Sequence, residues 1–231
     1  MHLCVKLSCV NFKDKELIIF DFDGTLINSV PDLSLAINSM LSHYHQPTLG
    51  IDEITPFIGN GAKPLVKRAL ELAMQKQISD DFLNEAFQVY YKAYSEVPYS
   101  KTFMYPGVLE TLNYLQKKDY KMVICTNKPF AFIEPILEKL HISHLFQDWV
   151  GEDSLLTKKP DAGPLLHLAQ ISQTTIDKSI MVGDSRNDIL AAHNAKMQSI
   201  GVTYGYNYNE NIADYSPSKV VDTFADLQEL F

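Results

Sequence analysis

Four short apolar runs limit what this chain can fold into, because polar or turn residues bound each run and segments of helical periodicity separate them. The runs are Leu17–Phe20, Met122–Cys125, Ile180–Val182 and Ser199–Val202. Continuous apolar runs of this length are typical of central parallel strands, since helices cover both faces of such a sheet. Trp149 and Val150 are expected to belong to a further strand. The alternation predicts an α/β core with a doubly wound parallel sheet.

The interval from Pro31 to about Ser100 lacks this alternation and contains no convincing strand pattern. Its periodicity instead predicts helices over 31–45, 52–58, 62–77 and 80–96. We therefore expect an α-helical cap domain over residues 29–100, inserted into a core formed by residues 1–28 and 101–231. Residues 1–15 are interpreted as a short extension with at most one edge strand.

The charge balance narrows the possible partners. The 231 residues include 20 Lys and Arg against 28 Asp and Glu, a formal net charge of −8, which argues against nucleic acid or an anionic membrane as a partner. No run approaches the roughly 20 apolar residues that span a bilayer. Three cysteines are too few for a disulfide framework, so a reducing cytoplasm is the expected location. The oligomeric state stays open.

The strongest candidate for chemistry is the segment Asp21–Leu26, which directly follows the first apolar run. Ligands of open α/β sheets bind beyond the carboxyl ends of the strands, and side chains two residues apart on a strand point to the same side. Asp21 and Asp23 could therefore share one site, with Gly24 allowing the turn. One carboxylate could act as nucleophile and metal ligand, and the other as proton donor. The alternative interpretation is an acidic strand end that caps a turn.

Polar residues also follow the later runs. Thr126 and Asn127 offer a hydroxyl and backbone N–H groups that suit a phosphate oxygen, although an ordinary helix cap has the same composition. Lys159 lies in a loop where a solvated lysine is the usual case. Asp184 and Asp188 offer hard oxygens that suit Mg²⁺, but they also fit routine capping. Each signal alone is weak, and their order at successive strand ends favours one common site.

These motifs resemble those of the haloacid dehalogenase superfamily of phosphatases over residues 16–231. The likeness rests on D-x-D-G-T at 21–25, Thr126, Lys159 and the Gly-Asp-x₃-Asp segment at 183–188. Segments 57–62 (FIGNGA) and 201–207 (GVTYGYN) further resemble the phosphoglycolate phosphatase family. The resemblance implies a Rossmann-like core with an inserted helical cap. It also implies Mg²⁺-dependent hydrolysis of 2-phosphoglycolate, a small anionic phosphate ester, to glycolate and phosphate.

The resemblance also implies roles for individual residues. Asp21 would attack phosphorus and form an aspartyl-phosphate, while Asp23 would protonate the leaving alkoxide and later deprotonate a water. The Asp21 carboxylate, the Asp23 backbone carbonyl and Asp184 would hold Mg²⁺. Lys159 would hold phosphoryl oxygens, and Asp188 would orient Lys159 or a metal-bound water.

Residues of both the core and the cap are expected to bind the substrate. Thr126 and the Asn127 amide would contact the phosphoryl group, and Gly59, Asn60 and Gly61 would bring backbone N–H groups close to the substrate as the cap shuts. Two alternatives on the same scaffold are a phosphosugar mutase and a phosphatase for another small phosphate ester. A third is a catalytically dead phosphate-binding regulator, in which we would expect the reacting residues to be lost.

Overall fold

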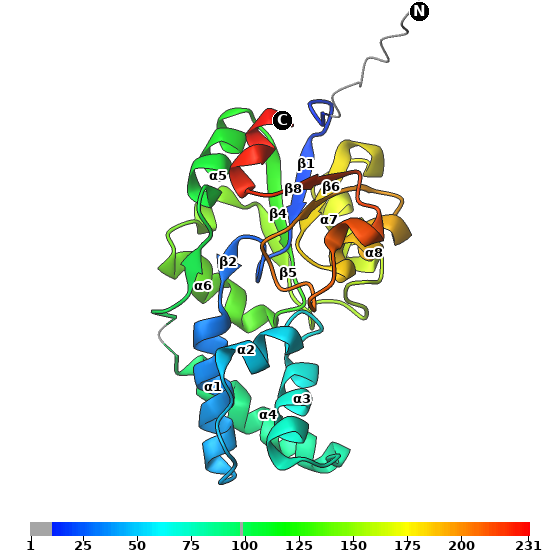
Figure 1. Cartoon of the computed structure of the whole chain (residues 1–231). Helices are drawn as coiled ribbons and strands as arrows, with labels where there is room; N and C mark the ends of the chain where they lie inside the picture. Colours follow the sequence, from blue (N-terminus) through cyan, green and yellow to red (C-terminus); the bar gives the residue numbers. More distant parts are fainter. Residues whose placement is uncertain (1–10, 98) are drawn as a thin grey trace, which may run out of the picture.

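The computed structural model describes residues 11–97 and 99–231. Its centre is a six-stranded sheet in the order β5-β4-β1-β6-β7-β8, in which all neighbouring strands run parallel (Figure 1). The strands are β1 (Leu17–Phe20), β4 (Lys121–Cys125), β5 (Asp148–Val150), β6 (Ser179–Gly183), β7 (Gln198–Val202) and β8 (Lys219–Val221). The four apolar runs form β1, β4, β6 and β7, and Trp149 and Val150 lie in β5, so these predictions are confirmed.

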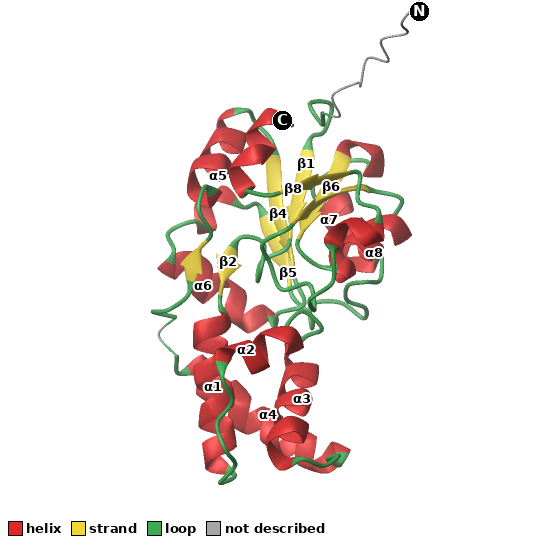
Figure 2. Ribbon diagram, viewed as in Figure 1, coloured by secondary structure: helices red, strands yellow, loops and turns green. Residues whose placement is uncertain are grey.

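Helices cover both faces of this sheet (Figure 2). They are α5 (Val108–Lys117), α6 (Ile133–Lys139), α7 (Gly163–Ile171) and α8 (Arg186–Asn194). Alternate residues of β1 pack into two different apolar clusters, Ile18 and Phe20 with α5 and α6, and Leu17 and Ile19 with α7 and α8. A strand that is buried on both faces needs apolar residues at every position, which explains the unbroken run in the sequence.

A second group of helices lies below the carboxyl ends of the strands in Figure 1. These cap helices are α1 (Val30–His43), α2 (Ile51–Ile54), α3 (Ala62–Met74) and α4 (Asp80–Ser95), and α1 packs along α4. The predicted helices are confirmed to within a few residues. The one predicted over 52–58 is a single α-helical turn followed by a 3₁₀ segment, Thr55–Phe57, where Pro56 interrupts the backbone hydrogen bonding.

The two connections between the cap helices and the sheet pair with each other. Strand β2 (Ile27–Asn28) runs antiparallel to β3 (Phe103–Met104). These strands could not be predicted from the sequence, because two residues are too short to carry a periodic pattern. Strand β8, a three-residue edge strand that begins with an exposed lysine, was not predicted either. The edge strand considered for residues 1–15 lies partly outside the described residues, and residues 11–15 form no strand.

Candidate active site

A cavity lies where the carboxyl ends of the core strands face the cap helices. Its core side is lined by Asp21, Asp23, Thr126, Asn127, Lys128 and Lys159, among others, and its cap side by Leu33, Ile58, Gly59, Gly61, Leu65, Tyr90 and Tyr94. Residues from widely separated segments of the chain thus meet at one point. Most of the residues predicted from the sequence to be functional lie in or beside this cavity.

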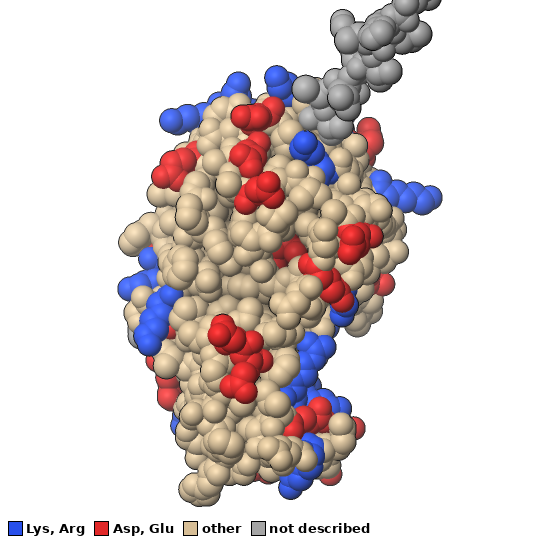
Figure 3. Space-filling model, viewed as in Figure 1, with Lys and Arg blue, Asp and Glu red and all other residues tan. Residues whose placement is uncertain are grey.

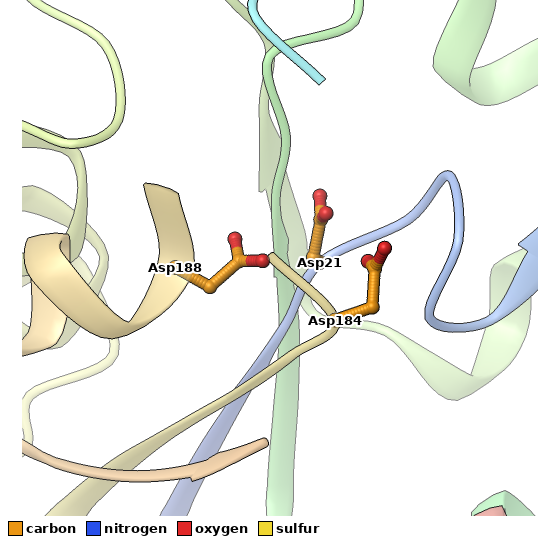
Figure 4. Close-up of side chains that lie close together, drawn as sticks. All are labelled: Asp21, Asp184 and Asp188. Carbon is orange, nitrogen blue, oxygen red and sulfur yellow. The ribbon is translucent and has the colours of Figure 1, made fainter. Parts of the chain in front are cut away.

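Three buried aspartates form the centre of the site (Figure 4). Asp21 follows β1, Asp184 follows β6, and Asp188 lies in the first turn of α8. One carboxylate oxygen of each lies within 4.8 Å of the others. Lys159 Nζ lies 2.8 Å from Asp21 Oδ1 and 2.6 Å from Asp188 Oδ1, with only 2% of its side chain exposed. The topology of the sheet therefore brings together residues that are far apart in sequence.

The charges in this cluster do not balance. Burial and the neighbouring Asp188 raise the pKa of Asp21 well above its usual range, and the same two causes raise the pKa of Asp184 to about 7. Although burial opposes it, the Asp188 and Asp21 carboxylates raise the pKa of Lys159. One ammonium group faces three carboxylates, which leaves an excess of negative charge among hard oxygen ligands. The donor set therefore fits a bound divalent cation.

Backbone and hydroxyl donors hold Asp184 in place. Its Oδ1 accepts a hydrogen bond from the Thr25 hydroxyl at 2.8 Å, and its Oδ2 accepts one from the Tyr206 backbone N–H at 2.7 Å. A Cβ atom at Gly24 or Gly205 would come within 2.4 or 2.1 Å of the Asp184 carboxylate, so both positions require glycine. Neither Thr25 nor Tyr206 was predicted from the sequence to contact the site.

Hydrogen bonds from Ser29, next to the first cap helix, and from Lys128 of the core hold the Asp23 carboxylate in place. Its Oδ1 accepts a hydrogen bond from the hydroxyl of Ser29, the residue before α1, and both of its carboxylate oxygens accept from Lys128 Nζ, at 3.2 and 3.1 Å. Lys128 also donates to the hydroxyl of Tyr94 on α4 at 2.8 Å. Sequence reasoning missed Lys128, although it directly follows Thr126 and Asn127 in the chain.

Thr126 and Asn127 follow β4 and line the cavity. The Thr126 hydroxyl accepts a hydrogen bond from the Lys128 backbone N–H at 3.2 Å. The Asn127 side-chain amide donates to the Lys159 carbonyl at 2.9 Å and to the Gly59 carbonyl at 3.0 Å. The Asn127 side chain thus joins the lysine loop to the cap.

The glycine-rich cap loop binds the core in this structure. Gly59 and Gly61 line the cavity with φ values of +108° and +101°, and the Asn60 carbonyl accepts a hydrogen bond from Lys158 Nζ at 3.0 Å. The Ala62 N–H at the start of α3 donates to Glu152 Oε1 at 3.1 Å. The Glu152 carboxylate of the core therefore already accepts the hydrogen bond of this N–H group. The substrate contacts expected of Gly59, Asn60 and Gly61 stay a prediction.

On the face that Figure 3 shows, acidic and basic side chains are mixed. Among the described residues, no helix has the length and apolar character that a membrane span needs. The cationic groups at the cavity are instead buried lysines.

Comparison with known proteins gives matches over most of the chain. The profile of the family described as haloacid dehalogenase-like hydrolase matches residues 18–202. A phosphoglycolate phosphatase of Psychrobacter arcticus is 42% identical over 217 residues, covering 93% of this chain and 94% of that protein. One of Colwellia psychrerythraea is 39% identical over 220 residues, covering 94% and 97%. The crystal structure of a predicted phosphoglycolate phosphatase from Haemophilus somnus has a TM-score of 0.88 and 38% identity, and covers 94% of this chain and 97% of that one.

These matches extend over both the core and the cap helices. The likeness to phosphoglycolate phosphatases makes the chain an enzyme of the phosphoric monoester hydrolase class. The chain belongs to the haloacid dehalogenase-like hydrolase family.

Proposed function

We propose that this enzyme hydrolyses 2-phosphoglycolate to glycolate and phosphate through an aspartyl-phosphate on Asp21, with Mg²⁺ as its cofactor. The observation that carries the proposal is the position of Asp21 at the end of β1, paired with Lys159 and facing the cavity that also contains Asp23. The relatives named phosphoglycolate phosphatase support the choice of substrate.

The proposed reaction has two steps, in which Asp21 and Asp23 alternate. Asp21 attacks phosphorus, and the bond from phosphorus to the ester oxygen breaks as Asp23 gives its proton to the departing glycolate alkoxide. Asp23 then takes a proton from a water that attacks phosphorus, which breaks the bond to Asp21 and releases phosphate. Both carboxyl groups thereby return to their starting states.

The remaining polar groups would hold the phosphoryl oxygens and the metal. We assign Lys159, the Thr126 hydroxyl and the Asn127 backbone N–H to the phosphoryl group. Asp188 would orient Lys159, which its 2.6 Å contact supports. The carboxylates of Asp21 and Asp184 and the backbone carbonyl of Asp23 would hold Mg²⁺. When bound, Mg²⁺ would neutralise phosphate charge and so allow an anionic nucleophile to approach.

Two further parts of the interpretation stay proposals. We propose that the cap comprises residues 29–100 and the core residues 1–28 and 101–231, which agrees with the change from sheet to helices at these connections. We also propose that the enzyme acts in the cytoplasm, where the unpaired, buried thiol of Cys125 would stay reduced.

The test of the function is a panel of phosphate esters assayed with Mg²⁺ and with EDTA. The panel contains 2-phosphoglycolate, glycerol phosphate, a hexose phosphate and p-nitrophenyl phosphate. We expect the highest kcat/KM for 2-phosphoglycolate and no turnover in EDTA. A higher kcat/KM for another ester would refute 2-phosphoglycolate as the preferred substrate. Full activity after dialysis against EDTA would refute the requirement for Mg²⁺.

Metal binding is expected to depend on pH, because protons and Mg²⁺ compete for the same carboxylates. The pKa of Asp21 is raised, and that of Asp184 is about 7. Both carboxylates therefore take up protons at a higher pH than ordinary carboxyl groups do. The increase in Tm caused by Mg²⁺ should therefore be larger at about pH 8 than at about pH 5.5. Thermal melts with and without Mg²⁺ measure this increase, and equal increases at the two pH values would contradict the expectation.

A further inference from the structure

Lys128 is a buried lysine to which the proposed reaction gives no role. It is 5% exposed and lines the cavity between the core and the cap helices. Its ammonium group contacts both oxygens of Asp23 and the Tyr94 hydroxyl, and it lies 4.9 Å from the centre of the Tyr94 ring. A buried ammonium is retained only where charged or polar partners compensate its lost hydration. Lys128 therefore places a positive charge on the side of the cavity that contains the proton donor of the proposed reaction.

Two tyrosines on α4 face the same region. Tyr90 and Tyr94 are each 1% exposed and line the cavity, and their rings stack at 5.9 Å. The Tyr90 hydroxyl has no hydrogen-bond partner among residues 11–97 and 99–231. Tyr94 accepts from Lys128, which leaves its own hydroxyl proton available. Burial raises the pKa of both tyrosines well above the usual value, so both hydroxyls stay hydrogen-bond donors.

Three other donor groups near the cavity already have partners within the protein. Lys159 pairs with Asp21 and Asp188 at the phosphoryl end of the cavity. The Ala62 N–H and Lys158 both bind Glu152. The remaining cap-side lining is Leu33, Ile58, Ala62 and Leu65, together with the backbone of Gly59 and Gly61. Beside Asp23, Lys128 offers a positive charge and the two tyrosines offer hydroxyl protons to a second anionic group on a ligand.

We propose that Lys128, together with the Tyr90 and Tyr94 hydroxyls, binds the carboxylate of the leaving group and so selects phosphate esters with an anion close to the ester oxygen. This inference rests on the proposed function, in which Asp23 protonates that same leaving group. A carboxylate one carbon from the ester oxygen stays close to Asp23 and thus comes within reach of Lys128. A neutral group at the same place would lack the attraction to the Lys128 ammonium, and it would accept a weaker hydrogen bond from a tyrosine hydroxyl than a carboxylate does, so it binds less tightly.

The test compares 2-phosphoglycolate with 2-hydroxyethyl phosphate, which has a neutral hydroxymethyl group in place of the carboxylate. For wild type we expect a higher kcat/KM with 2-phosphoglycolate. Lys128→Met should lower activity on both esters because it removes a contact of Asp23. It should also reduce the ratio of the two kcat/KM values by about tenfold or more, the equivalent of one charge-assisted hydrogen bond.

Three further variants sharpen this test. Lys128→Arg keeps the positive charge and should keep most of the preference. Lys158→Met removes a lysine that joins the cap to the core beside the cavity, and should leave the ratio unchanged. Tyr90→Phe removes a hydroxyl that has no partner in the described protein, so it should fold like wild type and reduce the ratio by about threefold or more. This variant decides the question if Lys128→Met does not fold.

The outcomes separate this inference from the proposed function. A wild-type preference that survives intact in both Lys128→Met and Tyr90→Phe overturns the carboxylate subsite and leaves the proposed substrate standing. Equal hydrolysis of the two esters by wild type refutes both. A ratio that collapses in Lys128→Met and persists in Lys128→Arg supports the subsite.

Discussion

Replacing Asp21 by asparagine is expected to abolish turnover while leaving the metal-free protein at least as stable as wild type at about pH 8. The loss of activity follows because an amide cannot act as the anionic nucleophile. The effect on stability follows from the raised pKa of Asp21. A carboxyl group whose pKa is raised on folding contributes stability below its unfolded pKa of about 3.9, and this contribution is lost as the pH rises through the folded value.

Asparagine at position 21 is not ionised at any pH, so it avoids that loss. Thermal melts in EDTA at about pH 8 and about pH 4 test the stability, and product release with Mg²⁺ tests the activity. Asp81→Asn is the matched control, since it makes the same chemical change at an exposed position of α4. Turnover within about tenfold of wild type would remove Asp21 from the role of nucleophile.

Lys159→Met is expected to reduce activity at least 10²–10³-fold, roughly the effect of removing one preorganised donor to a reacting oxyanion. Unlike Asp21→Asn, it should also destabilise the metal-free protein. Lys159 is the cation in contact with Asp21 and Asp188, and removal of one partner from a buried ion pair costs about 3–5 kcal/mol. The free energy of unfolding should therefore fall by about this amount at about pH 8.

The destabilisation by Lys159→Met should shrink in acid. Asp184, with its pKa at about 7, is already largely protonated in the wild type at about pH 5, so less negative charge is left uncompensated there. Denaturant titrations in EDTA at the two pH values measure the difference. Lys67→Met, at an exposed cap lysine, provides the control. A loss of stability that is independent of pH would mean that Lys159 stabilises the fold by packing and not by its charge.

The core strands and the reacting residues could be predicted because their physical constraints are local. Strand β1 is buried on both faces and therefore has an unbroken apolar sequence. Asp21 and Asp184 directly follow such strands, at the sheet edge where ligands bind. Lys159 lies in a loop that has no comparable local pattern. It could be assigned to the site only from the order of the motifs along the chain and from the family resemblance.

The contacts that hold the site residues in place could not be predicted from the sequence, because they depend on tertiary structure. Tyr206 holds Asp184 through its backbone N–H, a contact that any residue type could make. Lys128 carries no sequence signal of burial, because its burial depends on α4, whose Tyr94 hydroxyl accepts a hydrogen bond from it. Glu152 binds the start of α3 from a loop of the core. Such contacts join segments whose relative positions no periodic pattern in the sequence specifies.

The central place of β1 in the sheet has a consequence for the order in which a newly synthesised chain can fold. Both neighbours of β1, strands β4 and β6, come after the cap helices in the sequence. The emerging chain therefore presents an apolar strand with two unpaired edges while the cap is being made. The contacts among the cap helices all fall within residues 30–95, so the cap can assemble before β4 and β6 are made. Strand β1 gains its second neighbour only after β6 has been synthesised, and a strand edge that is unpaired until then favours aggregation.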